Sequence, residues 1–133
     1  MKLLVSLALL LTALTLSAQT LEVSADLRES DLDLDYAHVM SVRANRQGGS
    51  WRFEVSVRHG DRGWGHYADR WIVVDAQSGE EYGRRVLAHP HDTEQPFTRS
   101  QSGIIIPEET EAVIIKAACT VHGFGGTELV LRF

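Results

Sequence analysis

Hydrophobic and polar residues alternate along most of this chain, with the period of two expected of a β-strand that buries one face and exposes the other. The clearest example is segment 50–59, whose apolar positions are Trp51, Phe53, Val55 and Val57. Clusters of Gly, Pro, Asn, Asp and Ser separate the alternating segments and predict turns between them. No segment has a convincing amphipathic helix pattern. We therefore expect strands over 35–44, 50–59, 67–76, 81–89, 97–106, 112–122 and 127–133.

Seven short strands over about 100 residues, without helices, predict an all-β fold. The expected architecture is a two-sheet antiparallel sandwich of the immunoglobulin or fibronectin type III kind, with Trp71 buried in its third strand. We assign residues 34–133 to this single domain. The acidic segment 19–33 is expected either to add an edge strand or to remain an N-terminal extension.

The first 18 residues have the pattern of a secretory signal peptide, with one Lys, a largely apolar run from Leu3, and small residues around Ser17 and Ala18. The run is short and no charged stop-transfer flank follows it, so we expect no membrane span in the mature chain. The pattern predicts cleavage after Ala18 and a secreted or periplasmic protein.

Charge and cysteine content narrow the possible partners. Without Lys2 the chain has 12 basic and 18 acidic residues, a net charge of about −6 with neutral histidines. This balance disfavours nucleic acid and anionic membrane surfaces as partners. Cys119 is the only cysteine, so no intrachain disulfide can form. It shares a strand face with Val113 and Ile115, which favours a buried apolar role over a reactive or ligating thiol.

Four of the six histidines lie in three predicted loops. His66 follows the second strand, His89 and His91 follow the fourth, and His122 follows the sixth. In an antiparallel sandwich these three connections lie at the same end. Imidazole is a common ligand of zinc and copper, so the cluster is interpreted as either a metal site or a buried polar network.

For the metal hypothesis the expected ligands are His66, His89, His91 and His122, with Glu94 as a substitute for one of them. Zinc and copper both accept imidazole, and affinity order alone favours copper. Asp69 is expected to fix the tautomer of a nearby ring or to pair with an arginine. Arg99 is expected to clamp an acidic group or to pair with Asp69 or Asp92. His59 is a weaker fifth candidate ligand, and His38 is assigned to structure.

The alternative is a metal-free interaction module. In it the histidine rings pack with Trp64, Tyr67 and Phe124, and the aromatic and Arg-rich rim binds a secreted protein or a cell-envelope ligand. Catalysis has little support, because Ser100 and Ser102 lack a nucleophile-elbow motif and no base or substrate pocket is identifiable. We expect a binding protein rather than an enzyme.

Three segments of the chain, HYADRW, LAHPHDTEQPFTRS and VHGFGG, together with Gly103 and Pro107, resemble a family of small secreted bacterial proteins. These proteins share an HPHxxEQPFTR core and have no known function. The resemblance covers roughly 36–133 and implies a single exported domain, without an activity or catalytic residues. The chain departs from the family pattern at Gly65, where an acidic residue is frequent, and at Cys119.

Overall fold

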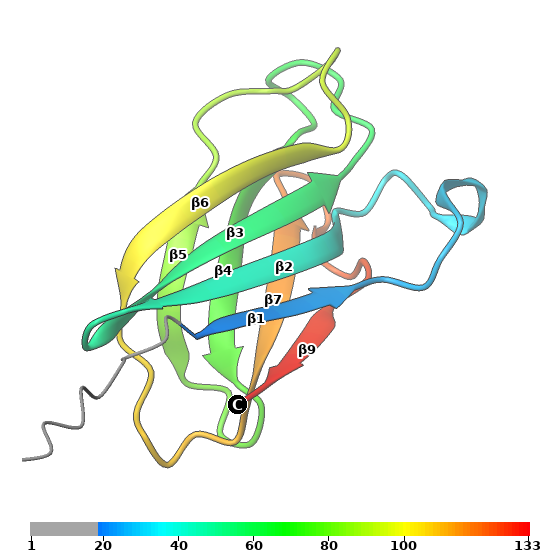
Figure 1. Cartoon of the computed structure of the whole chain (residues 1–133). Coiled ribbons are helices and arrows are strands. Elements are labelled where there is room, and N and C mark those ends of the chain that lie inside the picture. The colour runs from blue at the N-terminus through cyan, green and yellow to red at the C-terminus, as the bar shows by residue number, and fades with distance from the viewer. Residues whose placement is uncertain (1–18) are drawn as a thin grey trace, which may run out of the picture.

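The computed structural model describes residues 19–133, which form two antiparallel β-sheets packed face to face (Figure 1). The first sheet has the order β1 (Thr20–Ser24), β2 (His38–Gln47), β3 (Ser50–Arg58) and β6 (Phe97–Ile104). The second has the order β5 (Glu81–Val86), β4 (Ala68–Asp75), β7 (Ala112–Cys119) and β8 (Gly123–Phe124), with β9 (Leu129–Arg132) also pairing with β7. A single short 3-10 helix, η1 (Glu29–Asp31), lies within the described residues.

The predicted two-sheet antiparallel sandwich is confirmed. Each of the seven predicted strands is present, and β1 and the short β8 are additional. Strand β1 pairs with β2 along the edge of the first sheet, so the start of the 19–33 segment forms an edge strand. The predicted signal peptide, residues 1–18, lies outside the described residues. Across 19–133 no helix has the length and apolar character needed to cross a membrane.

The core lies between the two sheets and is built from the inward positions of the alternating segments. Its largest fully buried side chains include Trp71, Phe53 and Phe97, and Cys119 is 1% exposed. The predicted burial of Trp71 and of Cys119 is therefore confirmed. Each buried aromatic or aliphatic side chain stabilises the sandwich by roughly 1.5–3 kcal/mol.

The three histidine-bearing loops meet at one end of the sandwich, as the strand order predicted. The loop after β3 is joined to the loop after β5, because the Gly63 amide donates to Asp92 Oδ1 at 3.1 Å. The start of β4 is joined to the end of β7, because the Thr120 amide donates to the Tyr67 carbonyl at 3.0 Å. The segment before β2 reaches the same end, where the Gly60 amide donates to the Leu34 carbonyl at 2.9 Å.

Candidate metal centre

His59 lies at the base of this end, directly after β3. The alternation that buries Trp51, Phe53, Val55 and Val57 continues to His59, which is completely buried. Its Nδ1 lies 2.6 Å from Asp61 Oδ1, and its Nε2 lies 3.2 Å from the carbonyl oxygen of Asp35. Both neighbours are hydrogen-bond acceptors, so each ring nitrogen of His59 faces an oxygen atom.

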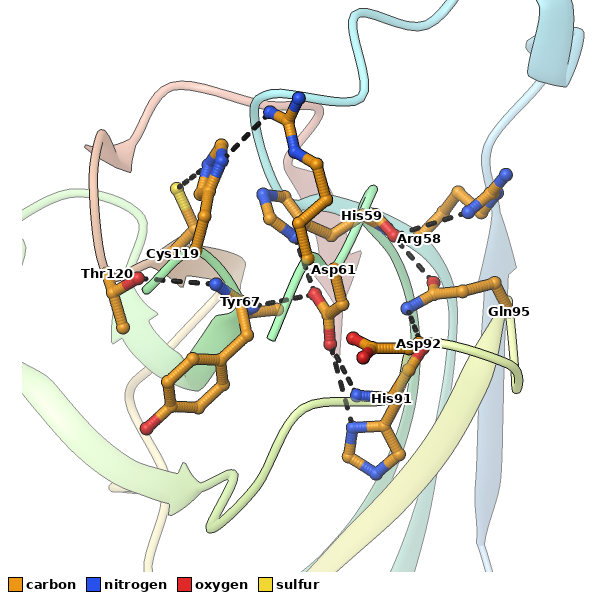
Figure 2. A network of polar contacts seen from close by, with 12 residues as sticks. Arg58, His59, Asp61, Tyr67, His91, Asp92, Gln95, Cys119 and Thr120 are labelled. Atoms are coloured by element: carbon orange, nitrogen blue, oxygen red, sulfur yellow. Dashed lines mark hydrogen bonds and ion pairs between the residues drawn. The ribbon is translucent and has the colours of Figure 1, made fainter. Parts of the chain in front are cut away.

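Asp61 lies between His59 and His91 (Figure 2) and its side chain is fully buried. It accepts hydrogen bonds from His59 Nδ1, from the Ala68 amide at 2.9 Å and from the His91 amide at 2.7 Å. Burial alone would raise the pKa of Asp61. The hydrogen bonds from His59, His91 and Ala68 outweigh it and lower the pKa below its usual 3.8. Asp61 is therefore an ionised carboxylate that fixes the His59 ring.

His66 and Cys119 approach His59 from the loop after β3 and from the end of β7. Cys119 Sγ lies 3.7 Å from His66 Nε2, and the His122 amide donates to the sulfur at 3.3 Å. Arg62 Nη2 donates to His66 Nδ1 at 3.0 Å. An arginine can only donate, so His66 Nε2 is the nitrogen that carries the ring proton, and it faces the Asp35 carbonyl oxygen at 3.2 Å.

His59 Nε2, His66 Nε2 and Cys119 Sγ all contact the carbonyl oxygen of Asp35, the sulfur at 3.5 Å. One ligand atom from each of these three side chains lies within 4.8 Å of the other two. Among residues 19–133 this is the one such group of His, Cys, Asp or Glu side chains. Thiolate and imidazole are the ligands that zinc and copper prefer, so the His59–His66–Cys119 site could hold a metal ion.

The loop after β5 holds His59 and Asp61 in place through hydrogen bonds. Gln95 Oε1 accepts a hydrogen bond from the His59 amide at 3.1 Å, and Gln95 Nε2 donates to the His91 carbonyl at 3.1 Å. The His91 amide in turn holds Asp61. The HPHDTEQPF segment thus fixes the backbone of His59 and the carboxylate that orients its ring.

Of the other predicted ligands, His91 and His89 do not belong to the group of three donors. The buried His91 ring stacks on Phe97 at a centroid distance of 3.9 Å, and its Nε2 accepts from Arg99 Nη2 at 2.9 Å. Burial, followed by the positive charge of Arg99, lowers the pKa of His91. His89 is exposed, and its Nδ1 contacts the Pro90 carbonyl at 2.9 Å.

Glu94 lies apart from the three donors, whereas His122 borders them and donates its amide to Cys119 Sγ. The exposed His122 ring packs between Tyr36 and the His66 ring, at centroid distances of 5.0 and 5.3 Å. Glu94 is exposed and pairs with Arg99 at 3.3 Å. Its hydrogen bond to Arg99 lowers its pKa. Of the expected ligands, His66 belongs to the group of donors that the structure brings together, and its companions in that group are His59 and Cys119.

The remaining predicted residues form the rim of this end. Asp69 pairs with Arg70 at 2.9 Å, and the carboxylate that orients a histidine is Asp61 instead. Trp64 is 68% exposed and packs edge-on against Tyr67 at 5.7 Å, while the Arg70 guanidinium lies 5.0 Å from the Phe124 ring. Arg99 pairs with Glu94 of the loop after β5 at 3.3 Å rather than with Asp69 or Asp92.

Comparison with known proteins gives few relatives. No known protein-family profile matches the chain. A protein of Halomicrobium mukohataei named "Putative lipoprotein" is 41% identical over 103 residues, which cover 77% of this chain and 50% of that protein. The chain thus spans about half the length of this relative. The crystal structure of hypothetical protein PH1083 from Pyrococcus horikoshii OT3 is similar over 83% of this chain and 95% of its own, with 16% identity and a TM-score of 0.48.

Proposed function

We propose that the protein is an exported metal-binding protein that holds zinc or copper at the His59–His66–Cys119 site. The observation that carries this proposal is the convergence of three donor atoms on one point. A nitrogen and a sulfur ligand of one ion, with bonds of about 2.0 Å and 2.3 Å, lie roughly 3.5–3.7 Å apart. The Cys119 Sγ to His66 Nε2 distance of 3.7 Å matches this separation.

The surroundings of the donors favour a metal ion. The Asp61 carboxylate on His59 Nδ1 leaves Nε2 as the ligating atom, an arrangement common around metal-bound histidines. A thiolate is the form of cysteine that binds metals, and the His122 amide donates a hydrogen bond that stabilises it. Metal binding would therefore replace the protons on the two imidazole Nε2 atoms and on the sulfur.

Export is supported by the signal-peptide pattern of residues 1–18 and by the similarity to a protein named as a lipoprotein. We also propose that the chain belongs to the secreted family with the HPHxxEQPFTR core, and that its sandwich is of the immunoglobulin-like kind. In this proposal the HPHxxEQPFTR core is a support for the metal site rather than a set of ligands, since His91 and Gln95 contact Asp61 and His59.

Thermal melts test the proposed function. The melting temperature of the purified protein should rise on addition of zinc or copper and fall with a chelator, because a ligand at about 100 times its Kd stabilises the folded state by roughly 2.7 kcal/mol. Cys119→Ser and His66→Gln should remove this response, and the matched control His89→Gln, at an exposed position, should keep it. A wild-type melting temperature that neither metal nor chelator changes would contradict the proposal.

A second candidate is a metal-free interaction module. The specific observation is the rim of exposed aromatic and apolar side chains at the same end, with Trp64 68%, Val121 55% and Phe124 40% exposed. Large aromatic side chains in the open are typical of protein-binding surfaces. If zinc, copper and chelator all leave the melting temperature unchanged, binding of a secreted or envelope partner at this rim becomes the favoured function.

A further inference from the structure

The carbonyl oxygen of Asp35 lies at similar distances from all three donor atoms. It lies 3.2 Å from His59 Nε2, 3.2 Å from His66 Nε2 and 3.5 Å from Cys119 Sγ. An atom at nearly equal distances from three others lies near the axis through the centre of their triangle. An ion bound by the three donors would lie between them, with this carbonyl oxygen facing it from one side of their plane.

Contacts of the two residues before Asp35 hold this stretch of backbone in place. The Leu34 carbonyl, one residue before it, accepts the Gly60 amide at 2.9 Å, and His38 Nε2 contacts the Asp33 carbonyl at 2.6 Å. His38 Nδ1 in turn accepts the Thr127 amide at 2.9 Å. These contacts restrain the Asp35 carbonyl oxygen at its position beside the three donors.

This arrangement distinguishes the two candidate metals. Zinc takes four short bonds in a tetrahedron, with oxygen ligands at about 2.0–2.2 Å, and at a site with three protein ligands a water molecule supplies the fourth. Copper is found in trigonal sites of two histidines and one cysteine, with a weak, long axial ligand that is a backbone oxygen in some proteins. The thiolate also favours copper(I), which prefers soft ligands.

We propose that the ion at the His59–His66–Cys119 site is copper, bound in a trigonal plane with the Asp35 carbonyl oxygen as its axial ligand. This inference rests on the proposed function and narrows it to one metal. His59 and Cys119 are buried, so they shield the ion from water, while the half-buried His66 gives it a route from the surface.

Optical spectroscopy of the full protein with copper(II) tests this inference. One equivalent of copper(II) should produce an intense visible absorption band from thiolate-to-copper charge transfer, and an electron paramagnetic resonance spectrum with narrow copper hyperfine splitting. An excess of zinc of about tenfold should leave the band in place, because copper binds such ligands more tightly. His89→Gln should retain the band, and Cys119→Ser should lose it.

The outcomes separate this inference from the proposed function. Stoichiometric zinc binding that depends on Cys119, without a thiolate band on addition of copper(II), would overturn the copper assignment and leave the proposed function intact. A copper band that persists in Cys119→Ser would also overturn it, because the chain has no other cysteine. Should Cys119→Ser fail to fold, His66→Gln replaces it, since His66 is only half-buried, and it should shift or abolish the band. Failure of both zinc and copper to bind would overturn both proposals.

Discussion

Asp61→Asn should destabilise the protein strongly, because this carboxylate accepts three hydrogen bonds inside the molecule. An asparagine has one acceptor oxygen, which can keep the contacts of Asp61 Oδ1 with His59 and Ala68. Its amino group would then face the buried His91 amide, which would lose its only acceptor here. A hydrogen bond to a charged group contributes about 1.5–3 kcal/mol, and leaving the buried His91 amide without an acceptor adds about 1–3 kcal/mol, so we expect a loss of roughly 3–5 kcal/mol.

The assay for this prediction is urea denaturation with and without chelator, together with thermal melting. For a domain of this size the expected loss corresponds to a fall in melting temperature of roughly 10–20 °C. The matched control is Asp69→Asn, which removes a partly exposed ion pair with Arg70 and should cost less than about 1 kcal/mol. Equal stability of the two variants would refute the reasoning that Asp61 organises this end of the sandwich.

Three further predictions concern single positions. Burial, followed by the Arg99 charge, lowers the pKa of His91, so near pH 6.5 the unfolded chain binds a proton that the folded chain does not. The free energy of unfolding should therefore fall between pH 7 and pH 5. His91→Gln should reduce that fall in urea titrations, and an unchanged dependence of stability on pH would argue against this role of His91. Cys119 should react with an alkylating reagent only after unfolding, and rapid labelling of the native protein would place the thiol outside the core. A Cβ on Gly126 would lie 1.9 Å from the Ala37 carbonyl oxygen, so Gly126→Ala should lower the free energy of unfolding by about 1–3 kcal/mol in denaturant titrations. Gly49→Ala, which has open space around it, should change that free energy little. Equal effects of the two substitutions would contradict the packing argument.

The fold could be predicted from the sequence because alternation is a local signal. In an antiparallel sandwich, the number of strands then determines which loops share an end, so the meeting of the three histidine loops followed without any knowledge of contacts. The extra strand β8 has two residues, Gly123 and Phe124, which is too short to show a period. The pairing of β1 depends on its register against β2, from Thr20 opposite Asn45 to Ser24 opposite Ser41, which composition does not reveal.

The site was only partly predictable. His59 and Asp61 continue the inward positions of β3, and extending the alternation past Arg58 would have marked both as buried. The alternation of β7 predicts Cys119 on the inward face, as the structure has it. It does not reveal that the sulfur lies 3.7 Å from His66 Nε2, because a buried cysteine is typical of an apolar core position. The Asp35 carbonyl belongs to the backbone, so no residue type in the sequence signals its position.

Elemental analysis of the protein, purified without an affinity tag, tests the central claim most directly. The account predicts close to one copper or zinc ion per chain in the wild type, and a ratio near zero in Cys119→Ser purified in parallel. His89→Gln should match the wild type, since that histidine is exposed and lies outside the site. A wild type without metal, or a metal content that Cys119→Ser leaves unchanged, would contradict the assignment of the His59–His66–Cys119 site.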